Sequence, residues 1–172
     1  MAAEPGDVGG AGLVVRAARS SDVGDIAAMI RALADYERLA HLCVGTEQDL
    51  QRALFGPHPS AEVLIAQVRG EAAGFALFFH TFSTFLAQRG LWLEDLFVIP
   101  EHRGRGVGKA LLKAVAGIAV ARRCGRFEWA VLDWNTPAIR FYERLGATLM
   151  HDWRIARVTG EALGALGRGT EM

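Results

Sequence analysis

The stretch from Leu91 to Lys109 reads LWLEDLFVIPEHRGRGVGK and changes character partway along. Its first nine residues are apolar except for Glu94 and Asp95, as in a largely buried strand, and a proline ends this run. Three glycines and three basic residues follow from Arg103 onward, and an apolar pattern with helical spacing comes next. Strand, glycine-rich loop and helix in this order predict a site where backbone N–H groups and a helix N-terminus bind a diphosphate.

The spacing of the glycines restricts which nucleotide motif this loop can be. A dinucleotide fingerprint requires G-x-G-x-x-G, whereas Gly104, Gly106 and Gly108 follow G-x-G-x-G. A Walker loop requires Ser or Thr after its lysine, and Lys109 is followed by Ala110. Neither motif fits. From these residues alone, a glycine-rich surface turn with solvated arginines remains the alternative.

The rest of the chain predicts a mixed α/β fold in one domain. Thr46 and Asp49 form a capping-box pattern, and Asn135 is a good N-cap for a later helix. Residues 83–90 read as a loop between two strands, and residues 127–132 as a strand buried on both faces. Strands are expected over 13–16, 63–68, 72–82, 91–99, 127–132 and 153–158, with helices after Ser20 or Ser21, Thr46, the glycine-rich loop and Asn135.

Composition excludes several classes of protein. The 172 residues carry 19 Lys and Arg against 19 Asp and Glu, so net charge favours neither nucleic acid nor an anionic membrane. Charged residues interrupt every long apolar stretch, and no membrane span is expected. Cys43 and Cys124 lack the spacing of a metal site or a disulfide framework, which indicates free thiols in the cytoplasm. Residues 1–12 read as a flexible tail.

Several motifs together resemble a known family. Arg103-x-x-Gly106-x-Gly108 matches the [RQ]-x-x-G-x-[GA] acetyl-CoA signature of the GNAT acetyltransferases. Residues 93–98 (LEDLFV), residues 130–135 (AVLDWN) and Phe141-Tyr142 resemble the diamine N-acetyltransferase branch, which includes the spermidine/spermine and thialysine enzymes. The similarity runs from about residue 14 to about residue 158. It implies a GNAT-type mixed sheet flanked by helices, in a single domain over residues 13–172.

The resemblance also implies an activity and its partners. It implies transfer of an acetyl group from acetyl-CoA, without a metal, to the primary amine of a small diamine or a lysine-like amino acid. Enzymes of this family are commonly homodimers, and Phe82, Phe85 and Trp153 are candidates for such an interface. The implied coenzyme-binding residues are Leu96, Phe97, Val98, Arg103, Gly104, Arg105, Gly106, Val107, Gly108, Lys109, Asn135, Ala138 and Tyr142.

Acyl transfer to an amine requires a proton acceptor for the ammonium and an acid for the departing thiolate. By resemblance, Tyr142 is the acid and Glu94 the substrate-binding, proton-accepting carboxylate. From spacing alone, a core tyrosine of an amphipathic helix is the commoner role for Tyr142. Successive strand residues point to opposite faces, so Glu94 and Asp95 are not expected to serve one site equally. For Asp95, a salt bridge to a neighbouring arginine is the alternative to a role in the site.

The acceptor side is less constrained by the sequence. By resemblance, Tyr36, Glu37, Glu94 and residues 128–130 (Glu128, Trp129 and Ala130) contact the substrate. A solvated helix end is the alternative for Glu37. Arg89, in the expected loop before the third long strand, favours a short diamine or an amino acid whose carboxylate it could meet. The alternatives for the whole chain are another acceptor, such as a protein N-terminus, an α-amine or a drug, and a non-catalytic acetyl-CoA sensor.

Overall fold

The computed structural model describes residues 12–169 of the chain, so the tail expected over residues 1–12 lies, apart from Gly12, outside the described residues. The chain divides into two compact units at the boundary between Ala130 and Val131. No helix among residues 12–169 has the length and apolar character needed to cross a membrane.

The first unit is built on a five-stranded sheet whose strands follow one another in chain order. β1 to β4 pair antiparallel, and β5 pairs parallel to β4, so the expected mixed sheet is confirmed. β2 and β3 form the predicted hairpin, which turns at Arg69 and Gly70. The strands are β1 (Leu13–Ala17), β2 (Glu62–Val68), β3 (Glu71–Ser83), β4 (Gln88–Val98) and β5 (Arg126–Trp129).

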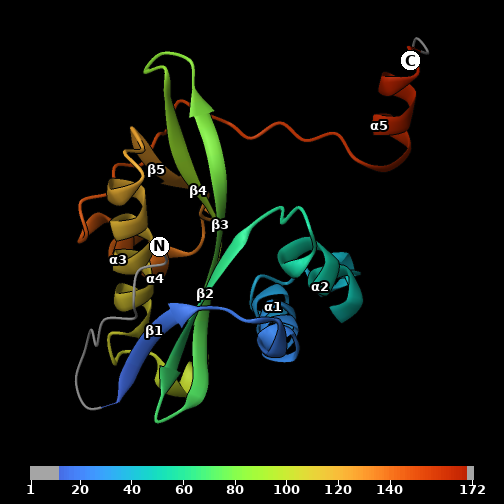
Figure 1. Cartoon of the computed structure of the whole chain (residues 1–172). Helices are drawn as coiled ribbons and strands as arrows, with labels where there is room; N and C mark the ends of the chain where they lie inside the picture. The colour runs from blue at the N-terminus through green and yellow to red at the C-terminus, as the bar shows by residue number, and fades with distance from the viewer. Residues whose placement is uncertain (1–11, 170–172) are drawn as a thin grey trace. The chain divides into compact units, whose positions relative to one another are not determined.

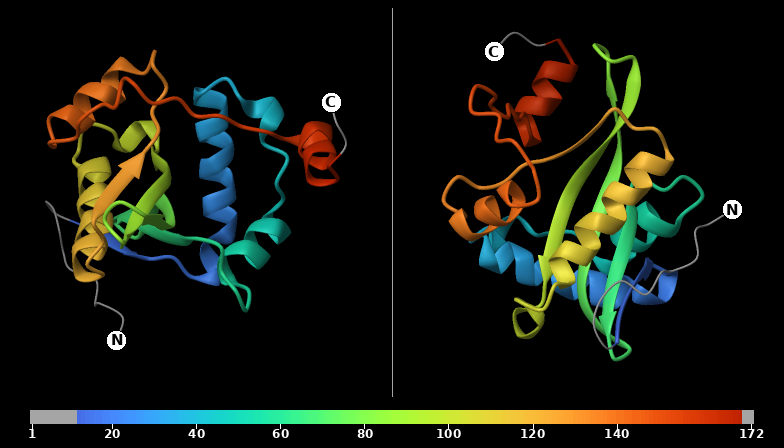
Figure 2. Two further views of the ribbon diagram at one scale, coloured as in Figure 1. Left: turned by 90° about the horizontal axis from the view of Figure 1, so that it is seen from above. Right: turned by 90° about the vertical axis from the view of Figure 1, so that its left-hand side faces the viewer.

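Helices cover both faces of this sheet (Figure 1; Figure 2). α1 (Val23–Tyr36) and α2 (Glu47–Phe55) lie on one face, and α3 (Val107–Ala121) lies on the other. Short 3-10 helices cover 20–22, 40–42 and 100–102, the first of them in place of the serine N-cap expected for α1. The capping box at the start of α2 is confirmed: the Thr46 hydroxyl accepts from the Asp49 amide at 3.2 Å, and the Asp49 carboxylate accepts from the Thr46 amide at 3.0 Å.

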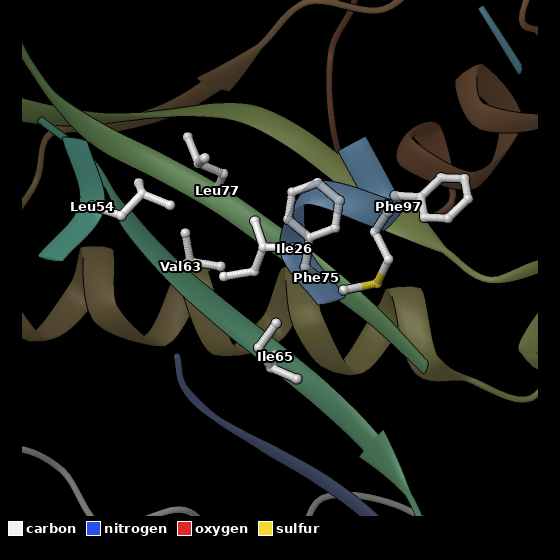
Figure 3. Packing of buried hydrophobic residues seen from close by; sticks show 8 residues of the cluster. Ile26, Leu54, Val63, Ile65, Phe75, Leu77 and Phe97 are labelled. Atoms are coloured by element: carbon white, nitrogen blue, oxygen red, sulfur yellow. The ribbon is translucent and has the colours of Figure 1, made fainter. Parts of the chain in front are cut away.

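A buried apolar cluster joins α1 and α2 to the sheet (Figure 3). Ile26 and Phe75 are fully buried, and Phe97 is the residue that β4 contributes to the cluster. The cluster fixes which way each β3 residue points, because side chains alternate between the two faces of a strand. Phe75 and Leu77 therefore face α1, whereas a Cβ added at Gly74 would meet a Leu111 methyl of α3 at 3.4 Å.

Three expectations about strands are wrong. The loop expected over 83–90 is only a short turn, since β3 continues to Ser83 and β4 begins at Gln88. β5 ends at Trp129, and its residues are partly buried at most, because it is the edge strand and pairs only with β4. Residues 153–158 alternate apolar and polar side chains but form no strand, because no described strand hydrogen-bonds with them.

The second unit contains α4 (Thr136–Glu143) and α5 (Gly160–Gly167). The Asn135 side-chain oxygen accepts a hydrogen bond from the Ala138 amide at 3.3 Å, which confirms the predicted N-cap of α4. Gly146 follows α4 with φ of 92°, in the left-handed region where glycine is favoured.

Candidate active site

A β-bulge in β4 changes the direction of the two mid-strand carboxylates. Asp95 lies opposite Leu77 and Leu93 lies opposite Phe78, so Glu94 is an extra residue with no partner on β3. Asp95 therefore shares the α1 face with Leu77. The Trp92 indole donates to the Glu94 carboxylate at 2.8 Å, which places these two side chains together on that face as well.

The expectation that Glu94 and Asp95 point to opposite faces is therefore wrong. Strand alternation requires a regular ladder, and the bulge interrupts it at this position. The expectation of an arginine partner for Asp95 is also wrong, since among residues 12–169 no cation forms an ion pair with it.

Asp95 is instead a buried carboxyl beside other carboxylates. Its pKa is raised from 3.8 to about 6, mainly by burial and to a smaller extent by the charges of Glu94 and Glu37. Glu37 follows the last residue of α1, and burial raises its pKa too. Glu37, Glu94 and Asp95 thus form a carboxylate cluster, which suits a ligand with more than one ammonium group. Sequence reasoning missed Asp95, and its only signal was a second acid inside an apolar strand.

The cluster adjoins an open edge of β4. The parallel ladder with β5 covers only Gly90–Leu93 of β4, from the pair Gly90 and Arg126 to the pair Leu93 and Trp129. Beyond Leu93, no described strand pairs with this edge of β4, so the backbone groups of Leu96 and Val98 that point away from β3 have no strand partner. Unpaired strand edges bind extended ligands through main-chain hydrogen bonds. This edge fits the amide-containing pantetheine arm expected at Leu96, Phe97 and Val98.

The glycine-rich loop has the backbone that the sequence predicts. Gly104 and Gly106 have φ of 74° and 85°, and Gly106 is the residue before α3. No side chain caps this helix, so its first backbone N–H groups remain available to an anion. Val107 is fully buried and can contribute only its backbone to a ligand. Arg105 lines a surface cavity of about 460 Å³ together with Arg69.

The Arg103 side chain is engaged within the protein. Its Nε donates to the Val98 carbonyl at 2.9 Å, and its guanidinium carbon lies 5.2 Å from the centre of the Tyr36 ring and 5.6 Å from that of Phe97. Both distances lie within the range of cation–π attraction. The loop is thereby connected to the end of α1 and to the end of β4.

Three residues expected near the acceptor, Glu128, Trp129 and Arg89, have other neighbours in the structure. Glu128 forms an ion pair with Arg126 at 2.6 Å, which compensates its charge, while the Trp129 ring lies 5.0 Å from that of Phe127. Arg89 lies on β4 opposite Phe82, in the hairpin that projects beyond the sheet in Figure 1. It is five residues, about 17 Å along the strand, from Glu94. A short acceptor cannot contact both, so the expected role of Arg89 is not supported.

The predicted acid lies in the second unit. Tyr142 is buried at 8% exposure on α4, with its ring 5.2 Å from that of Phe141. The Asn135 side chain accepts the capping hydrogen bond from the Ala138 amide, so Asn135 is the N-cap of α4 independently of any contact with coenzyme. No group of three or more His, Cys, Asp and Glu residues that could bind a metal occurs among residues 12–169, and Cys43 and Cys124 are unpaired.

Residues 26–147 match the acetyltransferase (GNAT) family. The chain belongs to the GNAT family. A thialysine N-epsilon-acetyltransferase of Mus musculus is 39% identical over 160 residues, which cover 87% of this chain and 94% of the relative. An L-ornithine N5-acetyltransferase of Arabidopsis thaliana is 34% identical, covering 90% of this chain and 87% of the relative.

Solved structures share this fold. An integron cassette protein of V. cholerae superposes with a TM-score of 0.78 at 26% identity, covering 92% of this chain and 99% of the other. A ribosomal-protein-alanine N-acetyltransferase of Brucella melitensis shares the fold, with a TM-score of 0.69 at 23% identity over 87% of this chain and all of the other. This GNAT protein is an amine N-acetyltransferase of the diamine and thialysine branch, and the family uses acetyl-CoA as cosubstrate.

Proposed function

We propose that this GNAT enzyme acetylates a primary amine of a small diamine or of a lysine-like amino acid. The observation that carries the proposal is the carboxylate cluster of Glu37, Glu94 and Asp95, with which no cation of residues 12–169 forms an ion pair. Clustered carboxylates repel one another, and a dication relieves that repulsion. The names of the thialysine and ornithine enzymes among its relatives support an acceptor that carries a side-chain amine.

In this proposal, residues 13–172 act as one acetyltransferase domain that binds acetyl-CoA along β4 and the loop. The open edge at 96–98 binds the pantetheine arm, and the backbone N–H groups of 104–109 bind the diphosphate. Arg105 and Lys109 supply positive charge beside it. Asn135 and Ala138 also contact the arm, as the resemblance to the family implies. The left-handed glycines at 104 and 106 support this, since they leave the loop backbone accessible.

The chemical step follows from the two assigned side chains. Glu94 accepts a proton from the bound ammonium, directly or through water, and the freed amine attacks the thioester carbonyl carbon. The C–N bond forms, and Tyr142 gives its proton to the thiolate as the C–S bond breaks. The attacking nitrogen then loses its second proton to the Tyr142 phenolate, directly or through water, and Glu94 releases its proton to solvent. Glu37 and Asp95 hold the second cationic group of the acceptor. General acid catalysis of this kind contributes about 10²–10⁴-fold.

The test is turnover on a panel of amines. Acetyl-CoA is titrated calorimetrically, and free thiol release is then followed with thialysine, ornithine, lysine, putrescine, spermidine and spermine. We expect measurable turnover and a higher kcat/KM for the short acceptors than for spermine. A preference for spermine would contradict the acceptor class, and coenzyme binding without turnover on any amine would support a sensor or a macromolecular acceptor.

We further propose that the enzyme is a cytoplasmic homodimer. Phe82 and Phe85 on the β3–β4 hairpin are 60% and 99% exposed, and Trp153 in the second unit is 75% exposed. Large exposed apolar side chains of this kind favour association. Analytical ultracentrifugation should give the mass of a dimer for the wild type and a mass closer to that of the monomer for Phe85→Ser. A wild-type monomer at micromolar concentration would contradict this part of the proposal.

A further inference from the structure

We infer that the Arg103 side chain positions the acceptor side of the site and does not bind the diphosphate of the coenzyme. This inference rests on the proposed function, and it reassigns a side chain that the glycine-loop motif alone places with the coenzyme. Arg103 is a positioning residue in this view, because it acts through Tyr36 and Phe97.

Three contacts give the guanidinium a fixed place. Its Nε–H is donated to the Val98 carbonyl at 2.9 Å, and the cation lies 5.2 Å from the Tyr36 ring centre and 5.6 Å from the Phe97 ring centre. Arginine is suited to such a site, since its planar cation stacks on aromatic faces and donates hydrogen bonds in its own plane.

The two rings differ in burial. Phe97 is 4% exposed and belongs to the buried cluster of Figure 3, so its position is set by the core. Tyr36 is 40% exposed and is the last residue of α1. The guanidinium contacts both rings, so Arg103 connects Tyr36, and with it the end of α1, to the core residue Phe97.

The restrained helix end carries the acceptor carboxylate Glu37. Glu37 directly follows Tyr36, and Asp95 precedes Phe97 by two residues. The contacts of Arg103 with Tyr36 and Phe97 therefore connect the two chain segments that carry these acids. Arg103 does not compensate either charge. The pKa of Glu37 is raised by burial alone, and that of Asp95 by burial and by other acids. The guanidinium thus sets where these carboxylates lie and leaves them free to bind ammonium groups.

Arg103→Gln, with Arg105→Gln as a matched control in the same loop, separates the two roles. For Arg103→Gln we expect the KM for putrescine to rise about two- to fivefold, the effect of losing an exposed cation–π contact, with the calorimetric Kd for CoA within about twofold of wild type. Arg105→Gln should weaken CoA and leave the putrescine KM nearly unchanged. A Kd for CoA about tenfold or more weaker in Arg103→Gln, with an unchanged putrescine KM, would overturn the inference.

A double-mutant cycle with Tyr36→Leu tests the coupling. If Arg103 acts through Tyr36, the double variant should raise the putrescine KM no more than Tyr36→Leu alone, whereas additive effects would overturn this route. The arginine Nε–Hε resonances of the wild-type protein provide a test without any folding risk. The Arg103 signal should be shifted by the rings and unchanged on adding CoA; a CoA-dependent shift to a phosphate-bonded position would refute the inference.

These outcomes are distinct from a failure of the proposed function. If no amine is acetylated, the proposed function is wrong. The CoA affinities of the two glutamine variants and the Arg103 resonance would still decide whether its guanidinium binds diphosphate.

Discussion

Replacing Asp95 by asparagine should stabilise the fold at neutral pH while damaging acceptor binding. Burial first, and then the charges of Glu94 and Glu37, raise the pKa of Asp95 from 3.8 to about 6. A carboxyl group with a higher pKa in the folded than in the unfolded state binds more protons when folded. Its contribution is therefore most favourable at acidic pH, and stability is lost as the pH rises from about 4 through 6.

The size of the effect follows from that rise. A change from 3.8 to about 6 corresponds to about 3 kcal/mol in full, of which about 2 kcal/mol develops between pH 4.5 and pH 7.5. Asparagine does not titrate, so the variant lacks this loss. Relative to wild type, Asp95→Asn should therefore gain about 2 kcal/mol of unfolding free energy between the two pH values.

Urea denaturation of both proteins at pH 4.5 and at pH 7.5 measures this difference. Any change in packing from the substitution is the same at both pH values and cancels. Asp35→Asn, the same substitution at an exposed position of α1, is the control and should show almost no difference between the two pH values. If the stability difference between Asp95→Asn and wild type does not change with pH, Asp95 is not a destabilised buried acid, and the reasoning about the cluster fails.

Three further predictions test other parts of the structure. Tyr142→Phe should lower kcat by about 10²–10⁴-fold with the Kd for acetyl-CoA near wild type, and an unchanged kcat in stopped-flow thiol release would remove Tyr142 from the acid role. Gly106→Val forces a branched residue to a φ of 85° in the coenzyme loop, so calorimetry should show weakened CoA binding; normal affinity would mean that the loop is misassigned. Asp22→Asn breaks the largely buried pair with Arg16, whose N–O distance is 2.7 Å, and should lower the unfolding free energy by about 3 kcal/mol in urea denaturation; a loss below about 0.5 kcal/mol would mean that solvent screens the pair.

Local signals predicted several features in both units. The capping box at Thr46 and the N-cap at Asn135 depend on side chains within three residues of one another, so the sequence alone contains the whole interaction. The loop between Gly104 and Gly108 is likewise defined by its own residues and by the helix that follows it.

The errors concern properties that depend on distant parts of the chain. The bulge at Glu94 is a mismatch between β4 and β3, and nothing within β4 alone indicates it. Residues 153–158 have a strand-like alternation, but a strand also requires a partner edge. The surroundings of Arg103 could not be predicted either, because Tyr36 lies 67 positions earlier in the chain.

The carboxylate cluster is the central claim, and one comparison of acceptors tests it directly. Putrescine and butylamine have the same four-carbon chain and differ in the second amine, so the ratio of their kcat/KM values at pH 7.5 isolates what the second ammonium gains. A charged hydrogen bond to Glu37 or Asp95 predicts a ratio of about ten or more in wild type, which should fall toward one in Asp95→Asn. Equal kcat/KM values for the two amines in wild type would contradict the claim that the cluster binds a second cationic group.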